Sequence, residues 1–365
     1  MSLRLAYLVG APGVPVQGPS GCSAHVRALA TAFSSMADTR VYAARKSDHR
    51  GVFGEDLPAW VGGVPGWPSW LARYRELREV WAARRLGRRL VEDGLSGWMP
   101  DLVVERHTLF SDAGWRAASR LHVPHVLEVN APLVLERERF ETVLRPEWAR
   151  GWERDVLLAA PAIAAVSRWL VRWLRQEVGC RNVRWVPNGV VPGKGDRARG
   201  RARLGLTPEE PAIGFVGSFK PWHGHQRLGA VAAAVDARLV LIGEGSEDVP
   251  GIAPERVVRT GFLDGAALSD AIAALDVGLA PYPDDAPPWF CPLKIFDYRA
   301  RGVPVVTTDV GDGSMLVRGG GLAVPPDDLD ALVDAVRRCL VSARPPIRVR
   351  SWGTVAREML ELGLG

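Results

Sequence analysis

The chain has 365 residues, of which 47% are hydrophobic and 24% charged, the balance of an ordinary soluble globular protein. Its length exceeds that of one ordinary domain, so two domains are expected, and no apolar run approaches the roughly 18 residues that a membrane-spanning helix needs. The net charge of +5 is modest, and the basic run at 73–90 also carries Glu76 and Glu79 at helical spacing, so a nucleic-acid groove is not indicated.

Short apolar runs rich in valine and isoleucine alternate with amphipathic segments along most of the chain. Strands are predicted at 3–9, 40–44, 101–105, 124–129, 162–166 and 183–186, and again at 212–217, 238–243, 256–260, 276–280 and 303–307. Helices are predicted between them at 22–36, 69–92, 167–178, 223–235, 265–274, 292–301 and 327–341. This alternation predicts an α/β protein with doubly wound parallel sheets and helices on both faces.

Two domains of similar size are expected on either side of a segment rich in proline, glycine and basic residues at 187–201. The first spans 1–190 and the second 191–349. A last helix at about 350–365 follows a proline-rich loop and is expected to cross back onto the first domain. The stretch VGGVPGWPSW at 61–70 is interpreted as a loop.

The cysteines and the amino-terminal residues indicate the cellular compartment in which the protein is expected. The four cysteines lie far apart with no C-x-x-C pair, so neither a zinc site nor a disulfide framework is indicated. The first nine residues lack a basic leader and a small-residue cleavage site, and are better explained as a buried strand than as a signal peptide. We therefore expect a cytoplasmic protein, while peripheral contact with a membrane surface stays open.

The first candidate site is the glycine-rich loop after the first strand, LVGAPGVPVQGPSGCSAH at 8–25. Its glycines leave the backbone free to approach a ligand, and Ser20 or Ser23 is a suitable cap for the helix that follows. A helix N-terminus behind such a loop suits a diphosphate. The spacing matches neither G-x-G-x-x-G nor the P-loop, so a plain loop of turns remains the alternative.

The second candidate site follows the strand that ends at Val216 and Gly217. Ser218, Lys220 and His223 come directly after it, before the next helix. Open α/β sheets bind ligands at the carboxyl ends of their parallel strands, which is where these side chains are expected.

The third candidate site is FCPLKIFDYRARGVPVV at 290–306. Pro292 suits the first position of a helix, and Gly302 followed by proline suits its end. Lys294 then lies in the first turn, where a cation opposes the helix dipole unless an anion binds there. Asp297 lies one turn on, on the same face, and is placed to accept hydrogen bonds from hydroxyl groups. A surface ion pair between Lys294 and Asp297 is the alternative.

Two sets of segments extend over nearly the whole chain. In the second half they are GFVGSFKPWHG at 214–224, LVLIGEG at 239–245, VVRTGFLDGAALSDAIAALDVGLAPYP at 257–283 and PLKIFDYRARGVPVVTTDVGD at 292–312. In the first half they are the glycine loop, VLEVNAPLVLER at 126–137, AIAAVSRWLVRWL at 162–174 and VRWVPNGVV at 183–191. Together these segments resemble the GT4 family of glycosyltransferases, which have the GT-B fold. The resemblance implies two facing Rossmann-like domains and a C-terminal helix that returns to the first.

The resemblance also implies an activity, namely sugar transfer from a nucleotide sugar to an acceptor hydroxyl, with retention and without an essential metal or other cofactor. Lys294, His223 and Lys220 are the implied catalytic residues of the second domain, and Glu128 and Asn130 fall where the family has a histidine near the transferred sugar. The implied donor-binding residues are Gly21, Gly217, Ser218, Phe262, Leu263, Cys291, Pro292, Leu293 and Asp297. Asp297 matches the second glutamate of the family's E-x7-E pattern, which holds the ribose, whereas the first falls on Trp289.

Other functions are less well supported. Asp328 and Asp330 form a D-x-D pattern that suggests a metal, but after two prolines they are better explained as helix-start acids. A nicotinamide dehydrogenase would need G-x-G-x-x-G, which is absent. A non-catalytic nucleotide-sugar-binding protein of the same fold stays open.

The acceptor is the least constrained part of the prediction. The region 60–81 is rich in tryptophan, and Trp67 and Trp70, with His107, are candidate acceptor-binding residues that could stack on sugars or apolar rings. Packing within the core of the first domain explains the tryptophans equally well. Small-molecule, glycan and lipid-linked acceptors all stay open.

Overall fold

A computed structural model of the protein describes residues 2–18, 20–46, 60–62, 74–245, 249–348 and 350–365. It divides into two compact units. The first contains residues 1–187, 289–291 and 352–365, and the second contains 188–288 and 292–351. No helix among the described residues is long and apolar enough to cross a membrane.

The first unit is built on a parallel sheet with the order β3-β2-β1-β4-β5-β6-β7. Its strands are β1 (Arg4–Val9), β2 (Asp38–Ala43), β3 (Trp60–Gly62), β4 (Leu102–Arg106), β5 (His125–Val129), β6 (Ile163–Ala165) and β7 (Val183–Trp185). The order reverses between β1 and β4, and this is the point at which open α/β sheets form a crevice for ligands.

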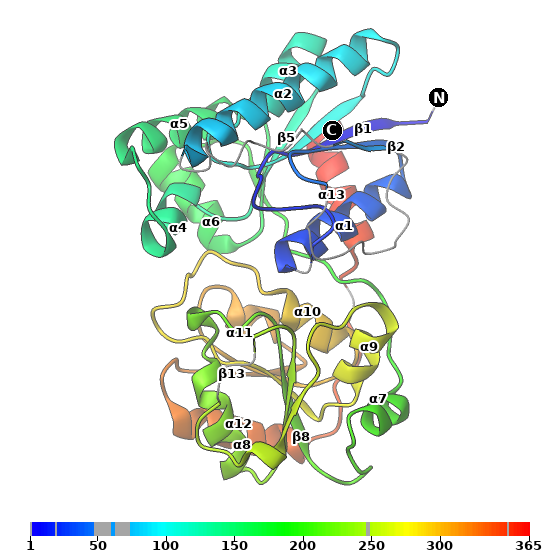
Figure 1. Cartoon of the computed structure of the whole chain (residues 1–365), viewed down its shortest axis with the longest axis vertical. Helices are drawn as coiled ribbons and strands as arrows, with labels where there is room; N and C mark the ends of the chain where they lie inside the picture. Colours follow the sequence, from blue (N-terminus) through cyan, green and yellow to red (C-terminus); the bar gives the residue numbers. More distant parts are fainter. Residues whose placement is uncertain (1, 19, 47–59, 63–73, 246–248, 349) are drawn as a thin grey trace. The chain divides into compact units, whose positions relative to one another are not determined.

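Helices cover both faces of this sheet. They are α1 (Gly21–Ser34), α2 (Arg75–Leu95), α3 (Ala113–Leu121), α4 (Leu133–Phe140), α5 (Pro146–Ala159) and α6 (Arg168–Trp173), which continues into a π turn at Leu174–Val178. Helices α2 and α3 lie on one face, and α1 lies on the other (Figure 1). The final helix, α13 (Trp352–Leu364), packs against α1, β4 and β5. The chain therefore returns to the first unit at its end, as expected.

The second unit repeats the plan with a parallel sheet of order β10-β9-β8-β11-β12-β13. Its strands are β8 (Ala212–Val216), β9 (Arg238–Ile242), β10 (Val257–Arg259), β11 (Val277–Ala280), β12 (Val305–Thr308) and β13 (Gly321–Val324). Its helices are α7 (Arg197–Arg203), α8 (Leu228–Ala234), α9 (Gly265–Ala273), α10 (Leu293–Ala300), α11 (Gly313–Leu316) and α12 (Leu329–Leu340), with single 3₁₀ turns at Pro221–His223, His225–Arg227 and Pro254–Arg256.

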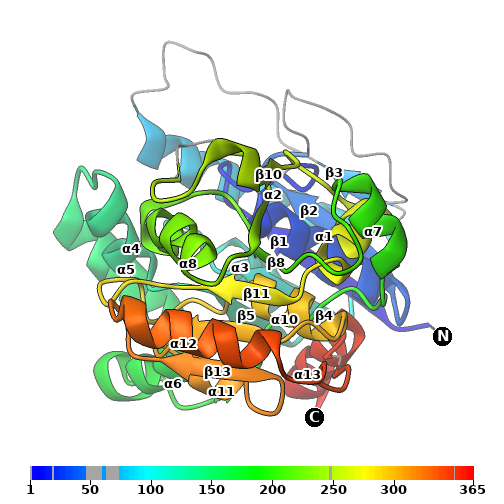
Figure 2. The same cartoon turned by 90° about the horizontal axis from the view of Figure 1, so that it is seen from below.

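The core of the second unit explains why these apolar runs form strands. Helices α8 and α12 cover the face of the sheet that lies in front in Figure 2. Their apolar sides, with Leu228 and Val231 on α8 and Val336 on α12, pack on Phe215 and Leu239 of the central strands, and all of these side chains are fully buried. Because both faces of a parallel sheet are covered, its strands are apolar runs rather than alternating ones. The predicted class, two doubly wound α/β domains, is confirmed.

Strands β3 and β13 and helix α7 differ from the sequence prediction, and helices α3, α4, α5 and α11 lie where it names no helix. Strand β3 occupies the start of the stretch interpreted as a loop, and pairs in parallel with β2 through Trp60, Val61 and Gly62. Strand β13 was not predicted, because it begins at the last of three consecutive glycines, a run that favours a turn. Helix α7 begins inside the segment 187–201, which was expected to be the domain boundary, and ends beyond it at Arg203.

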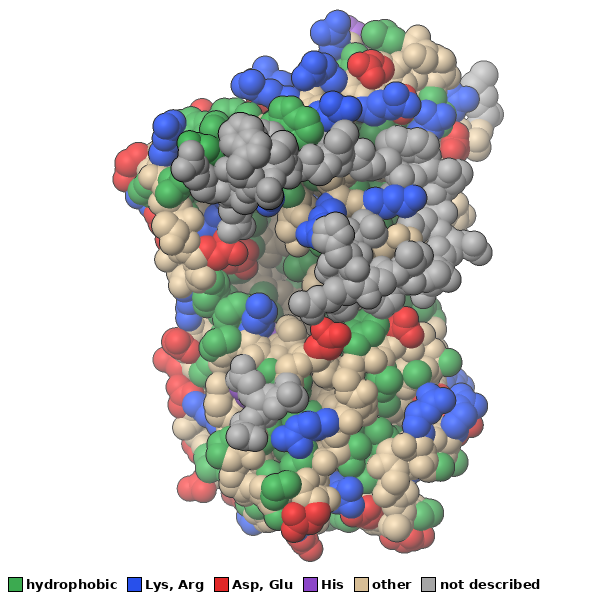
Figure 3. Space-filling view, in the orientation of Figure 1, with side chains coloured by type: hydrophobic (Ala, Val, Ile, Leu, Met, Phe, Trp, Pro, Cys, Tyr) green, Lys and Arg blue, Asp and Glu red, His purple; other side chains and the backbone are tan. Residues whose placement is uncertain are grey.

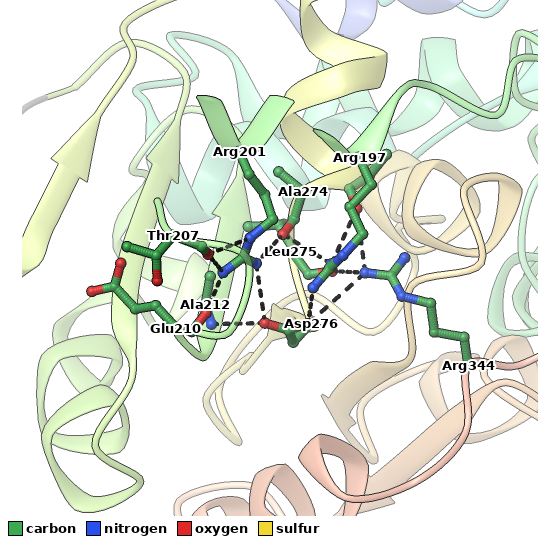
Figure 4. A network of polar contacts seen from close by, with 10 residues as sticks. Arg197, Arg201, Thr207, Glu210, Ala212, Ala274, Leu275, Asp276 and Arg344 are labelled. Atoms are coloured by element: carbon green, nitrogen blue, oxygen red, sulfur yellow. Dashed lines mark hydrogen bonds and ion pairs between the residues drawn. The ribbon is translucent and has the colours of Figure 1, made fainter. Parts of the chain in front are cut away.

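Contacts with other elements stabilise α7. Asp196 caps it by accepting a hydrogen bond from the Arg199 amide at 2.9 Å. Arg197 lies 2.6 Å from the Asp276 carboxylate, and Arg201 donates to the Ala274 carbonyl at 2.9 Å, at the end of α9 (Figure 4). A Cβ added at Gly200 would lie 2.1 Å from the Asp270 carbonyl oxygen, so glycine permits this close approach. Tertiary contacts of this kind override a weak helical sequence, which is why composition alone missed the helix.

Candidate functional site

The candidate site of the second unit lies where the strand order of its sheet reverses, at the carboxyl ends of β8 and β11. Gly217 follows β8, and its amide donates to the Ile242 carbonyl at the end of β9. The turn Pro221–His223 lies close to the end of β11. A Cβ added at Gly224, which follows the turn, would lie 1.7 Å from the Pro281 carbonyl oxygen, so glycine permits this close approach. The second predicted segment therefore reaches the ligand-binding edge of the sheet.

Lys294 lies at this edge and is the most unusual charge in the unit. It is buried, and its ammonium nitrogen has no hydrogen-bond partner among the described residues. The nitrogen lies 3.8 Å from the centre of the Phe215 ring and 5.3 Å from that of Tyr282. Burial lowers the pKa of Lys294 well below its usual value. An amino group buried in this way gains an attractive partner only if an anion enters beside it.

The backbone next to Lys294 is kept open by glycine. A Cβ on Gly217 would lie 3.4 Å from the Lys294 nitrogen, and the φ of +146° at Gly217 is one that other residues rarely adopt. A ligand atom beside Gly217 would therefore contact the Gly217 backbone and the Lys294 amino group together.

His223 belongs to the same cluster. Its ring centre lies 5.8 Å from that of Phe215 and 6.2 Å from that of Tyr282. Burial and the nearby charge of Lys294 lower the pKa of His223 to about 2, so its ring is neutral at physiological pH. Its Nδ1 atom is buried without a hydrogen-bond partner among the described residues. The structure thus brings Gly217, His223 and Lys294 together at one edge of the sheet, and their roles in donor binding and catalysis stay predictions.

The start of α10 adds main-chain donors beside Lys294. Pro292 is the N-cap rather than the first helical residue, and helix α10 begins at Leu293. No side chain of the described residues caps this helix, and its first turn, which is fully described, contains no acid. The helix N-terminus is therefore uncompensated and suited to an anion. Gly302, with a φ of +65°, follows the end of the helix as expected.

Asp297 does not pair with Lys294. Its Oδ1 atom accepts a hydrogen bond from Arg301 at 3.0 Å, and Arg301 also donates to the Ser269 hydroxyl at 2.9 Å. Burial raises the pKa of Asp297 to about 6, although the charge of Arg301 lowers it. The alternative of a Lys294–Asp297 surface ion pair is therefore wrong. Sequence reasoning missed Arg301, although its spacing of four residues from Asp297 on one helix was a usable signal.

The remaining donor-side candidates are less closely grouped. Ser218 and Lys220 are exposed, and the Lys220 ammonium lies 5.9 Å from the Trp222 ring centre. Phe262 and Leu263 are partly buried in the loop between β10 and α9. Cys291 is buried and groups with the first unit, as does the buried Trp289.

In the first unit the glycine loop ends at a capped helix. Ser20 is the N-cap of α1, and its hydroxyl accepts a hydrogen bond from the Ser23 amide at 3.1 Å. Gly21 is the first residue of α1 and is exposed. Arg27 donates to the carbonyls of Val16 and Gly18, at 3.0 and 2.7 Å, and so fixes the loop from within.

Glu128 is the centre of a buried network at the carboxyl edge of the first sheet. Its carboxylate accepts hydrogen bonds from Tyr7 at 3.0 Å, from Asn130 at 3.0 Å and from Arg106 at 3.3 Å, and His25 lies 2.5 Å away. These partners, His25 first among them, lower the pKa of Glu128 to about 2 despite its burial. The sequence pointed to Glu128 and Asn130 but not to Tyr7, His25 and Arg106, which come from three other elements.

The acceptor-side candidates divide into two groups. His107 is buried, and its Nε2 atom lies 3.2 Å from Glu153. Glu153 in turn accepts from the Leu133 amide at 2.6 Å at the start of α4, so His107 helps to fix that helix. Trp67 and Trp70 lie outside the described residues.

The D-x-D pattern begins a helix, as expected. Asp328 is the N-cap of α12, where its side chain accepts from the Ala331 amide at 2.8 Å. Among the described residues, no group of three or more histidine, cysteine or acidic side chains is arranged to hold a metal ion.

Comparison with known families agrees with this geometry. The model described as Glycosyltransferase Family 4 matches residues 19–194, and the one described as Glycosyl transferases group 1 matches residues 210–342. The chain belongs to the family 4 glycosyltransferases. The two models match the two units separately, and the residues around Lys294 fall within the second.

Known relatives of this glycosyltransferase share its sequence or its fold. A GDP-mannose-dependent alpha-mannosyltransferase from Mycolicibacterium smegmatis is 29% identical over 284 residues, which cover 73% of this chain and 74% of that protein. Sucrose-phosphate synthase from Thermosynechococcus elongatus has a TM-score of 0.66 at 21% identity, and covers 98% of this chain and 94% of its own. Anabaena HepE, solved with UDP and glucose, has a TM-score of 0.66 at 16% identity, and the match covers 99% of this chain and 95% of the HepE chain. The two structural likenesses show the fold alone.

Proposed function

We propose that this glycosyltransferase transfers a sugar from a nucleoside-diphosphate sugar to an acceptor hydroxyl, with retention of the anomeric configuration and without a divalent metal. The observation that carries the proposal is the buried amino group of Lys294, which has no hydrogen-bond partner in the described part of the chain, beside Gly217 and the N-terminus of α10. A diphosphate offers the negative charge that this cluster lacks.

Lys294 would act mainly on the leaving group. As the bond between sugar and diphosphate breaks, negative charge grows on the departing phosphate. Lys294 and the first amides of α10 are fixed in place around that position and stabilise the growing charge without reorganisation. In a site of low dielectric this effect is large, so a divalent ion is not required for the same purpose.

His223 and Asp297 would have separate roles. The neutral His223 ring, with a free Nδ1 atom, is placed to exchange a hydrogen bond with the diphosphate or the sugar without adding charge. Asp297 would accept a hydrogen bond from the ribose with the carboxylate oxygen that Arg301 leaves available. Ribose does not change charge during transfer, so Asp297 contributes to donor binding rather than to the chemical step.

Retention is supported by the family and by the name of one relative. The Mycolicibacterium smegmatis protein is named as an alpha-mannosyltransferase that depends on GDP-mannose, a donor whose mannose is itself α-linked. A product of the same configuration as the donor requires retention. The donor for this chain is accordingly sought first among GDP-mannose and UDP-glucose.

The test combines binding and transfer. Melting temperatures are measured with GDP-mannose, UDP-glucose and their nucleoside diphosphates, since a ligand that binds only the folded state raises the melting temperature. Donor turnover is then measured in EDTA and in magnesium, and the anomeric configuration of the product is read by NMR. Loss of turnover in EDTA with recovery in magnesium would overturn the metal-independent mechanism. The same melting profile with and without every nucleotide would overturn the donor site itself.

A matched pair of variants assigns any binding to this cluster. Lys294→Met removes the buried ammonium, whereas Lys194→Met removes an exposed lysine of the same unit. Only the first is expected to abolish the shift in melting temperature.

A further inference from the structure

A groove lies between α2 and α3 on the outer face of the first unit, away from the residues discussed so far. Its volume is about 770 Å³, within the range of small-molecule binding sites. Its floor is apolar and includes Ala83 and Val91 of α2 and Ala113 and Ala117 of α3. Arginine side chains gather over these two helices, which contain no lysine, at the top of Figure 3.

Small residues bring the two helices together beneath this groove. A Cβ added at Gly87 would lie 3.1 Å from the Ala113 carbonyl oxygen, and one at Gly94 would lie 2.9 Å from the Leu121 side chain. The order of these contacts shows that α2 and α3 run in the same direction. Both helices begin at the carboxyl edge of the sheet, since α2 precedes β4 and α3 follows it.

One end of the groove is aromatic. Phe110, in the loop between β4 and α3, is buried and has a φ of +64°, which is strained for a bulky residue. Trp148 stacks on it with a centroid distance of 4.6 Å and an interplanar angle of 16°. Trp152 lies beside both, and its Nε1 atom is buried with no hydrogen-bond partner in the described part of the chain. This end of the groove offers apolar surface and one unused donor, at the edge of the sheet where ligands bind.

The rim is basic. Arg84 and Arg88 on α2, and Arg116 and Arg120 on α3, line the groove at spacings of four residues, so each pair lies on one face of its helix. Glu92 and Asp112 are the acids among the lining residues, and Asp112 lies 2.5 Å from Arg116. Four arginines against two acids leave an excess of positive charge over an apolar floor.

We propose that this groove binds an anionic amphiphile, with its apolar chain along the floor and its phosphate or carboxylate among the arginines, and that such a molecule is the acceptor. The second statement rests on the proposed function. A small inorganic anion would leave the apolar floor unused, and a neutral apolar ligand would leave the arginines unpaired. The aromatic end of the groove lies at the carboxyl edge of the first sheet, which places one end of an extended ligand at the ligand-binding edge.

The test uses dodecyl phosphate below its critical micelle concentration, titrated into the full-length protein by calorimetry. Dodecyl maltoside and inorganic phosphate are the comparison ligands, because each carries only one of the two features. The expected result is saturable binding of one dodecyl phosphate per chain, with both comparison ligands at least about tenfold weaker.

A pair of double variants locates the binding. Arg84→Gln with Arg88→Gln removes two charges from the rim and is expected to weaken dodecyl phosphate binding about tenfold. Arg85→Gln with Arg89→Gln removes the same charge from the same helix outside the lining, and is expected to leave binding unchanged. Equal weakening by both pairs would show a non-specific charge effect and overturn the proposal.

Two further outcomes are decisive. Sedimentation with phosphatidylglycerol vesicles but no binding of monomeric dodecyl phosphate would overturn the groove in favour of a flat membrane surface. Nucleoside diphosphate binding is measured on the same samples. Dodecyl phosphate binding without any nucleotide binding would support the groove while the proposed function fails, and nucleotide binding without dodecyl phosphate binding would overturn the groove alone.

Discussion

The ammonium nitrogen of Lys294 lies 3.8 Å from the centre of the Phe215 ring, inside the second unit. The ring face attracts the cation, but this attraction is small compared with the lost hydration of a buried charge. The residue that is most favourable for a diphosphate is therefore unfavourable in the unliganded protein. The buried amine leads to one prediction about its replacement and to another about its protonation when a diphosphate binds.

Replacing Lys294 should stabilise the empty protein and inactivate it. Lys294→Met keeps the packing against Phe215 and removes the buried amine, so the free energy of unfolding should rise by roughly 1–3 kcal/mol. Turnover should fall about a hundredfold or more, because the growing charge on the leaving group loses its main partner. Urea unfolding and steady-state kinetics measure the two effects. A variant with wild-type kcat would show that Lys294 does not contact the reacting groups.

Donor binding should take up a proton at Lys294. Burial holds its pKa well below the usual value in the empty protein, and a bound diphosphate raises that pKa by supplying the missing negative charge. Between the two pKa values, binding of UDP or GDP therefore adds a proton to the protein. Calorimetry in Tris and in HEPES, repeated at several pH values at which both compounds buffer, detects this, since the two buffers have different ionisation enthalpies. Observed enthalpies that are equal in the two buffers at every pH would contradict the prediction, and Lys194→Met, which alters an exposed lysine outside the site, should leave the proton uptake unchanged.

The sequence predicted the plan of the fold because parallel strands buried on both faces are apolar runs, and such runs are visible without a structure. It also named Gly217, His223 and Lys294 as donor-site residues through the resemblance of their segments to family motifs, and that assignment stays a prediction. It could not predict the partners of Glu128. These partners are Tyr7 from β1, His25 from α1 and Arg106 from β4, and only the folded unit brings them beside β5. Helix α7 was missed for the same reason, since its arginines depend on Asp276.

Asp297 should make donor binding sensitive to mild acid. Burial raises its pKa to about 6, so the carboxylate is available above that pH and becomes protonated below it. The donor KM should therefore rise as the pH falls through 6, while kcat stays nearly constant, because ribose binding is equal in the ground and transition states. Asp297→Ala should raise the donor KM about tenfold at pH 7.5 and remove this dependence.

Arg301 provides the control for this assignment. Its positive charge lowers the Asp297 pKa, so Arg301→Met should move the midpoint of the KM profile to higher pH. An unchanged midpoint in Arg301→Met would mean that another group causes the dependence.

Glu128 should be required for the stability of the first unit. It is fully buried, and its carboxylate is the partner of the buried Arg106. Glu128→Gln keeps the shape but leaves Arg106 without a counter-charge, so the free energy of unfolding should fall by about 3 kcal/mol or more. The matched control is Glu147→Gln, which removes an exposed partner of Arg150 and should leave the free energy of unfolding nearly unchanged.

The pH dependence gives a second check. The folded-state pKa of Glu128 is about 2, below its ordinary value of 4.5, so its contribution is complete above pH 4.5 and is lost as the pH falls toward 2. The difference between wild type and Glu128→Gln, measured by urea unfolding, should shrink over that range. A difference that stays constant from pH 7 to pH 3 would show that the loss comes from packing and not from the charge, while unchanged nucleotide binding would show that the second unit remains folded.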